Sequence, residues 1–452
     1  MKCSTEAIQK MAEIMVSELE QVEMEAEGVR SVELAMREFL REVGSQALGS
    51  YLERKDAEIQ DTEQFCGCGE PLTYLFRRRG TILSVFGRVS YCRRYHVCED
   101  CHVGLSPLDR QMKIEAGQVT AGLAELLALA GVEISFEEGT RWLERYLLFR
   151  VSDNTLRKET ERFGELQNAE EAEWIKNSQD EQWLQQRQRE LGKQSGRLYG
   201  SLDGVMAPLV GEWRELKNIA WYRVEPVRSY QKRRRHAKRR VGEQNHLQAQ
   251  DISYHCDIQP PETFSQLFWA SACQRKADLY EELVFVCDGA AWIWKLIERH
   301  FPHAVQIVDW YHASQYLPPI AEAAFGSGTP RYHHWLEIAR TLLWDGRIAD
   351  LILACQQLSS FSLAQPAVHQ AVTYFTNNQP RMDYALFRQK GYFIGSGTVE
   401  SGGKQISGLR LKRAGARWTE QGAVATAKAR AAWLSHSWDI LASKRTALPL
   451  GA

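Results

Sequence analysis

Two closely spaced pairs of cysteines constrain the fold of this chain more than any other feature. Cys66 and Cys68 precede, and Cys98 and Cys101 follow, a segment rich in β-branched and aromatic residues with glycines at its turns. Strands that fold back on themselves would bring both pairs together, and four thiolates suit one tetrahedral Zn²⁺. The sequence therefore predicts a structural zinc site in a zinc-ribbon-like module. Four reduced cysteines without a metal are the alternative.

Other ligand types and a basic surface accompany the cysteines. Cys92, His96 and His102 compete for the metal, so the site is better defined than any one of its ligands. Six arginines in the same segment suit either contacts with phosphates or a solvated basic face: Arg77, Arg78, Arg79, Arg88, Arg93 and Arg94. A site closed by four thiolates has no open position for chemistry, so we expect it to be structural.

Composition excludes a membrane protein and a disulfide scaffold. The chain has 452 residues, a formal net charge of -1 and ten cysteines. Its longest apolar run, near 122–132, is shorter than the ~20 residues that a bilayer span requires, and the N-terminus lacks an apolar signal core. We expect a soluble, cytosolic protein of several domains with reduced thiols and no membrane partner.

Helical patterns flank the cysteine segment. Apolar residues at helical spacing in 5–60 predict two or three amphipathic helices, which suit a helical cap or a contact with a partner. Residues 117–163 have the layout of a helix-turn-helix, whose second helix would be capped by Ser152 or Asp153. Arg157 and Lys158 on that helix are candidate DNA contacts. Helix pairs joined by short turns also occur without DNA, so both interpretations stay open.

Acidic residues follow apolar strands in the second half of the chain. Asp203 ends one predicted strand, Asp288 a second and Asp309 a third, with His312 on the next turn. Acids at strand ends lie where an α/β sheet opens to ligands. Glu400 begins a predicted helix. Carboxylates gathered in one cleft could hold two Mg²⁺ for phosphodiester cleavage, whereas capping or surface roles are the alternative.

Two basic blocks point to a nucleic-acid partner. The first follows Glu400 and contains Lys404, Arg410, Lys412, Arg413 and Arg417. The second contains Lys232, Arg233, Arg234, Arg235, Lys238, Arg239 and Arg240, in a predicted loop between two strands. Such cations bind phosphates without reading sequence, and a solvated loop is the alternative.

Four blocks carry a resemblance to a known family. The strand with Asp203-Gly, VFVCDGAAWIW, DWYH and IGSGTVESGGKQI…LKRAGARWT together resemble DDE transposases of bacterial insertion sequences, in particular the ISKra-type group related to Mutator-like elements. The resemblance implies an α/β ribonuclease-H-like catalytic core with a helical insertion. Asp203, Asp288 and Glu400 match the three metal-binding acids, and His312 matches the histidine of a D-x2-H element.

The resemblance also implies partners and an organisation. We expect catalytic Mg²⁺ or Mn²⁺, double-stranded DNA of element ends and target, a homo-oligomer on DNA, and a place at the nucleoid of a bacterial cytoplasm. The expected segments are 1–62 helical, 63–110 zinc-ribbon-like, 111–165 helix-turn-helix-like, 166–196 polar helix and linker, 197–318 first part of the core, 319–393 helical insertion and 394–452 last part of the core. An inactive DNA-binding regulator and a metal-dependent DNA nuclease are the alternative functions.

Overall fold

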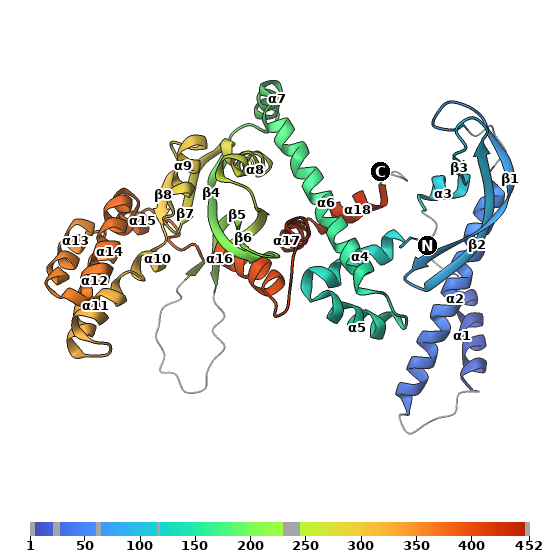
Figure 1. Cartoon of the computed structure of the whole chain (residues 1–452), viewed down its shortest axis with the longest axis horizontal. Coiled ribbons are helices and arrows are strands. Elements are labelled where there is room, and N and C mark those ends of the chain that lie inside the picture. Colours follow the sequence, from blue (N-terminus) through green and yellow to red (C-terminus); the bar gives the residue numbers. More distant parts are fainter. Residues whose placement is uncertain (1–4, 21–27, 60–64, 115–117, 229–244, 448–452) are drawn as a thin grey trace. The chain divides into compact units, whose positions relative to one another are not determined.

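A computed structural model describes residues 5–20, 28–59, 65–114, 118–228 and 245–447. The chain is a mixed α/β protein that divides into unit 1 (Met1–Phe163 and Asp439–Ala452) and unit 2 (Gly164–Trp438) (Figure 1). Among the helices within those described ranges, all are too short or too polar to cross a lipid bilayer. The basic block from Lys232 to Arg240 lies outside the described residues.

Unit 1 combines helices with a small antiparallel sheet. Its elements are α1 (Thr5–Leu19), α2 (Val29–Glu58), β1 (Leu72–Ser84), β2 (Gly87–Cys98), β3 (Gly104–Leu105), α3 (Pro107–Met112), α4 (Ala121–Glu133), α5 (Phe136–Leu147), the start of α6 (Asp153–Ser178) and most of α18 (Trp438–Ala447). The sheet has the order β1-β2-β3. Leu52 of α2 packs on Ile82 and Val89 of the hairpin, which buries one face of the hairpin near its turn.

Two of the basic residues beside the cysteines hold unit 1 together. Arg93 is buried and its guanidinium lies 2.7 Å from the Asp109 carboxylate. The Arg94 backbone N–H donates to Asp56, a fully buried carboxylate of α2. The half-buried Arg94 guanidinium donates to the backbone carbonyls of Asp56 and Ile59. Because both guanidinium groups are already bound within the unit, the expected basic face does not include these two arginines.

Unit 2 is built on a mixed five-stranded sheet. The strands are β4 (Gln194–Pro208), β5 (Trp213–Arg228), β6 (Asn245–Asp257), β7 (Tyr280–Cys287) and β8 (Val305–Val308), in the order β6-β5-β4-β7-β8. β4, β5 and β6 pair antiparallel, whereas β7 joins β4 and β8 joins β7 in parallel. β7 and β8 end side by side at Cys287 and Val308, whereas β4 continues past this level to Pro208.

Helices cover both faces of this sheet. On one face lie α8 (Pro261–Gln274) and α9 (Ala291–His300), and on the other α16 (Gly397–Gly403) and α17 (Glu420–Leu434) (Figure 1). The buried Trp221 of β5 stacks on Phe268 of α8 and meets Phe285 of β7 edge to face. Asn218 of β5, three residues earlier, therefore points to the opposite face, because side chains alternate along a strand.

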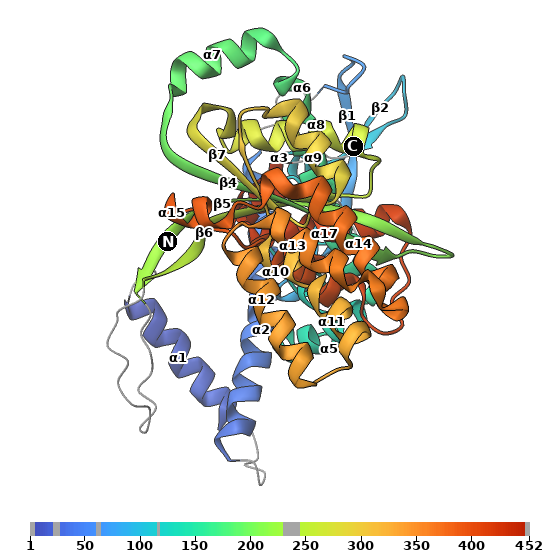
Figure 2. The same cartoon turned by 90° about the vertical axis from the view of Figure 1, so that its left-hand side faces the viewer.

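A helical group separates β8 from α16. Its members are α10 (Trp310–Ser314), α11 (Leu317–Phe325), α12 (Pro330–Trp344), α13 (Ile348–Gln357), α14 (Gln365–Asn378) and α15 (Tyr384–Gln389). α11 packs on α12 and α14, and α13 packs on α12 and α14, so these four form one bundle (Figure 2). The residues 319–393 are thus largely helical, as the sequence patterns indicated.

The segment 166–196 differs from the expected solvated helix and linker. Glu171 of α6 and Arg187 of α7 (Glu181–Leu191) are both buried, and β4 already begins at Gln194. Arg187 binds Asp278 through two hydrogen bonds of 2.9 and 3.0 Å. The boundary between the two units falls within α6 rather than near residue 196. The last residues, Asp439–Ala452, belong to unit 1 and not to the sheet-containing unit.

Candidate active site and metal centres

Three aspartates lie at the same level of three neighbouring parallel strands. Gly200 of β4 pairs with Phe285 of β7, and three further residues on each strand lead to Asp203 and Asp288. Cys287 pairs with Val308 of β8, so the next residues, Asp288 and Asp309, are again neighbours. β7 and β8 end just before Asp288 and Asp309, whereas Asp203 lies within β4, which continues to Pro208, so the expectation that a strand ends at Asp203 is wrong.

Glycines bring Glu400 to the same place. α16 packs directly on β4 and β5. A Cβ at Gly403 would lie 2.8 Å from Val205 Cγ2 and 3.5 Å from Asp203 Oδ2, and one at Gly402 would lie 2.4 Å from the Tyr254 ring. Only residues without a Cβ allow this approach of helix to sheet. Glu400 stands one turn before these glycines on the same helix and so faces the aspartates.

A histidine and two carboxylates form a compact ligand cluster. Ligand atoms of Asp309, His312 and Glu400 all lie within 4.8 Å of one another. His312 Nδ1 is 3.4 Å from Asp309 Oδ1 and 3.5 Å from Glu400 Oε1. Asp203 and Asp288 lie beside this cluster and not within it, but their charges act on it. The structure therefore groups the predicted acids with Asp309 and His312.

Hydrogen bonds orient these carboxylates. Asp309 accepts the backbone N–H of His312 at 2.7 Å and that of Ser396. The Ser396 hydroxyl donates to Glu400 Oε1 at 2.9 Å. Asp288 Oδ1 accepts the backbone N–H of Ala290 at 2.9 Å. Each acid keeps further oxygen lone pairs for a ligand.

Proton affinities reflect the crowding of negative charge. Burial, together with the charges of Asp288 and Glu400, raises the pKa of Asp203 to about 6. The hydrogen bond with Asp309 raises the pKa of His312, against the effect of its burial, and the charges of Asp309 and Glu400 act in the same direction. Burial opposes ionisation of Asp309, but hydrogen bonds from His312 and Ser396 lower its pKa overall. The site favours bound positive charge.

The donor set fits hard divalent cations. Burial and the charges of neighbouring carboxylates raise the pKa of Asp203, and the repulsion between these charges is relieved when cations bind between them. Oxygen ligands suit Mg²⁺ and Mn²⁺, and the imidazole of His312 suits Mn²⁺ better than Mg²⁺. Asp203, Asp288, Asp309 and Glu400 are thus the residues that could hold the metal.

Sequence reasoning missed two contributors to this site. Asp309 was expected to be either part of a D-x2-H element or only a strand-end cap; the structure shows that it caps α10 and also joins the ligand cluster. Ser396 was not predicted as a site residue, although it forms hydrogen bonds with both Asp309 and Glu400 and so connects these two acids. A small polar residue four positions before Glu400, one helical turn, is the signal that could have revealed it.

The four cysteines meet in unit 1 as the sequence predicted. Sγ of Cys66 lies 3.3 Å from that of Cys101, and Sγ of Cys68 lies 3.6 Å from Cys98 and 3.8 Å from Cys101. Tetrahedral zinc with sulfurs at about 2.3 Å separates them by about 3.8 Å. The backbone N–H of Cys68, with the neighbouring thiols, lowers the pKa of Cys66 to about 7. This cluster could bind a metal such as zinc, and Cys92 is not among its members.

The predicted DNA contacts have different surroundings. Lys158, Lys404, Lys412 and Arg417 are exposed. Arg157 pairs with Glu161 at 2.7 Å on α6, which follows α5 after a short turn, and Ser152 caps α6 by accepting the N–H of Thr155.

Arg410 and Arg413 are less exposed than the other predicted DNA contacts of this block. Arg413 is half-buried and donates to the Leu409 carbonyl at 3.0 Å. Arg410 is only 2% exposed, its guanidinium lies over the Trp418 ring, and burial lowers its pKa to about 9. The expectation that Arg410 contacts DNA is therefore corrected: in this arrangement it is a core residue.

Comparison with known proteins adds no identification. No protein-family model matches the chain, and no curated protein matches it significantly. Its function has to be inferred from the geometry described above.

Proposed function

We propose that this chain is a DDE transposase, which binds insertion-sequence ends and catalyses metal-dependent cleavage and transfer of DNA strands. One observation supports this most: Asp288 and Asp309 directly follow two adjacent parallel strands, Asp203 lies at the matching level of the neighbouring strand β4, and Glu400 comes from a helix packed on β4. The strand order β6-β5-β4-β7-β8, with three antiparallel strands followed by two parallel ones, supports the ribonuclease-H-like core that this proposal entails.

The residues of this site suit phosphoryl transfer. Divalent metal would supply activation of the attacking oxygen and charge neutralisation at the leaving oxygen. Asp203, Asp288 and Glu400 would hold it, with Asp309 as a further candidate ligand. His312, held between Asp309 and Glu400, would orient these acids or a phosphate oxygen. Lys404, whose ammonium lies 3.7 Å from Glu400, is exposed and would bring a phosphate toward the acids.

The proposal extends to the other modules. The α5–α6 pair would bind element ends, and the zinc-loaded cysteine cluster would stabilise the β1–β3 sheet. Oligomerisation on DNA would follow from the need to join two ends. Activity on the nucleoid of a bacterial cytoplasm follows from the same proposal.

The test is an assay of cleavage and joining on DNA that carries the element's own ends. Asp203→Ala, Asp288→Ala and Glu400→Ala should each abolish Mg²⁺- or Mn²⁺-dependent chemistry and leave end binding intact. Glu420→Gln, a change of an exposed acid on α17, is the matched control and should react like wild type. Cleavage without joining of a pre-cleaved end would favour a nuclease. End binding without any cleavage by wild type would favour an inactive regulator.

A further inference from the structure

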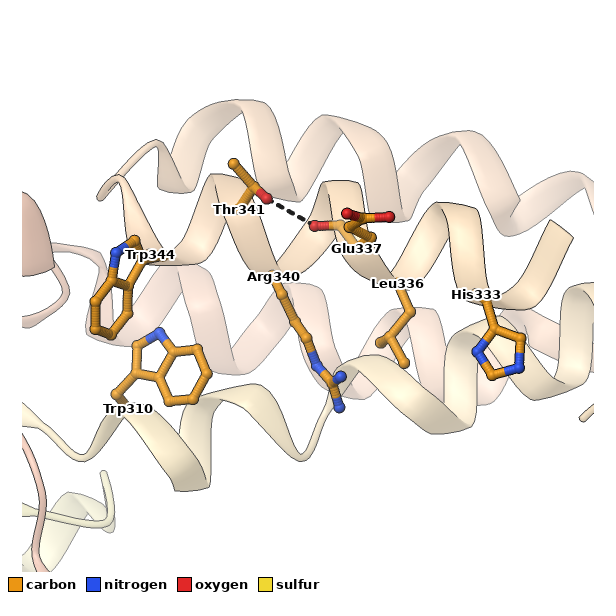
Figure 3. A pocket seen from close by; sticks show the side chains of 7 residues that line it. All are labelled: Trp310, His333, Leu336, Glu337, Arg340, Thr341 and Trp344. Carbon is orange, nitrogen blue, oxygen red and sulfur yellow. Dashed lines mark hydrogen bonds between the residues drawn. The ribbon is translucent and has the colours of Figure 1, made fainter. Parts of the chain in front are cut away.

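A groove of mixed aromatic and polar character runs along α12. One face of this helix provides His333, Leu336, Glu337, Arg340, Thr341 and Trp344, and α10 adds Trp310 (Figure 3). Together they line a cavity of about 380 Å³. The eleven residue steps from His333 to Trp344 correspond to about 16 Å at 1.5 Å per residue. The groove is therefore elongated along α12.

Two tryptophans form one end of the groove. Trp310 and Trp344 meet edge to face, with ring centroids 5.4 Å apart and an interplanar angle of 86°. Trp344 remains 39% exposed, and the Arg388 guanidinium lies 4.0 Å from its ring centroid. Figure 3 shows the nitrogen edge of Trp310 turned toward Trp344. Trp344, exposed beside the half-buried Trp310, offers a preorganised surface for a flat ring.

An exposed arginine, Arg340, lies in the middle of the groove. Arg340 is exposed, and in the described part of the chain its guanidinium makes neither a hydrogen bond nor an ion pair. Figure 3 shows it extending from α12 into the space between Trp310 and Leu336. Glu337 and His333 add an acceptor and an imidazole further along. Guanidinium groups bind phosphates, whereas the carboxylate suits the amino groups of a base edge.

The groove begins beside the carboxylates. Trp310 directly follows Asp309, and its backbone N–H donates to the Ile394 carbonyl at 3.2 Å, two residues before Ser396. The same short segments therefore place the Trp310 ring and the ligand cluster. A strand bound in the groove would continue toward the metal-binding acids.

We propose that this groove binds an unpaired DNA strand adjacent to the reacting phosphodiester, with one base against Trp344 and Trp310 and one phosphate at Arg340. Aromatic stacking combined with a cation is how proteins hold single-stranded nucleic acid. This inference rests on the proposed function, because that function supplies the DNA, and it adds that the DNA is unpaired at the site.

The experiment uses the full chain, without Mg²⁺, and two hexathymidylate probes. One probe carries fluorescein for anisotropy, and the other has a central 2-aminopurine whose fluorescence is quenched on stacking. Trp344→Ala should weaken binding about 5- to 150-fold and abolish the quenching, while Trp344→Phe keeps both. Arg340→Ala should reduce the slope of log affinity against log salt by about 0.7. Arg331→Ala, an exposed arginine of α12 outside the groove, is the matched control.

The outcomes separate this inference from the proposed function. The groove inference would be overturned if Trp344→Ala bound and quenched the probes as well as wild type does. It would also be overturned if Arg331→Ala and Arg340→Ala weakened binding equally. Asp203→Asn should lose cleavage but keep the quenching. If wild type quenches the probe through Trp344 yet never cleaves DNA, the groove stands and the transposase proposal fails.

Discussion

At the scale of single residues, the buried charge of Asp203 sets the response of the metal-free protein to pH. Its pKa is raised to about 6, against about 3.9 in an unfolded chain. The folded state therefore holds this proton more tightly, so the free energy of unfolding falls as pH rises from about 4 to about 6 and then stays low. Asp203→Asn should raise the stability of the metal-free protein at pH 8 by about 1–3 kcal/mol, and should have no such effect at pH 4.

Thermal unfolding with and without Mg²⁺ measures this effect. Mg²⁺ should raise the melting temperature of wild type at pH 8 and leave that of Asp203→Asn nearly unchanged, because ligand binding stabilises only a chain that binds it. Glu262→Gln removes an exposed carboxylate of α8 and serves as the control. If the metal-free Asp203→Asn variant had a lower melting temperature than wild type at pH 8, the prediction that a charged Asp203 destabilises the fold would be wrong.

The sequence was sufficient to predict the individual acids, but only part of their arrangement. Asp288 was found because an apolar strand ends just before it. Asp203 was found in an apolar stretch that was expected to end there, although β4 continues to Pro208, and the parallel pairing of β4 with β7 aligns the two acids. The role of Asp309 depends on contacts with Ser396, 87 positions away. The burial of Arg410 depends on Trp418 and on how the π-helical segment Lys404–Leu411 packs. No local pattern encodes such contacts.

At the scale of elements, the contact of α16 with β4 predicts a difference between two glycines. Gly403→Ala would place a methyl group 2.8 Å from Val205 Cγ2, so the helix has to move and carry Glu400 with it. We expect a large loss of metal-dependent cleavage and weaker Mn²⁺ binding in calorimetry. Gly408→Ala is the control on the segment that follows, because a Cβ there meets nothing within 4 Å. Equal activity of the two variants would show that close packing of α16 is not required.

The cysteine cluster predicts that metal removal destabilises the β1–β3 sheet. Purified protein should contain about one zinc per chain, and a chelator should lower the melting temperature of unit 1, since structural zinc contributes folding free energy. Cys98→Ser removes a buried ligand and should abolish zinc binding. Cys92→Ser, on the same strand but outside the cluster, should keep the metal. Elemental analysis and thiol titration measure both, and zinc retained in Cys98→Ser would contradict this ligand set.

At the scale of the whole molecule, polarity in the sequence was a poor guide to the boundary between units. The segment 166–196 is rich in Glu and Gln and was expected to be solvated. Glu171 is instead buried because it meets Lys428, 257 positions further along the chain, at 2.6 Å. Lys428 also lies 2.8 Å from Asp257, and His255 lies 3.2 Å from Glu171. In a sequence, the residues of a buried ion network resemble those of a solvated surface, because each charged residue can be recognised but its distant partner cannot.

This network predicts how unit 2 responds to acid and to mutation. The charge of Lys428, against the effect of burial, lowers the pKa of Glu171 to about 2. A carboxylate with a lowered pKa stabilises the fold at pH values above its unfolded pKa, so this contribution is present above about pH 4.3 and is lost as pH falls toward 2.

Lys428→Met leaves Glu171 and Asp257 buried without their cation and should lower the free energy of unfolding by about 3–5 kcal/mol. Calorimetry should show the transition of unit 2 at lower temperature and that of unit 1 unchanged, whereas Lys295→Met, at an exposed lysine of α9, should shift neither. A single shared transition that moves as one would show that the two units do not unfold separately.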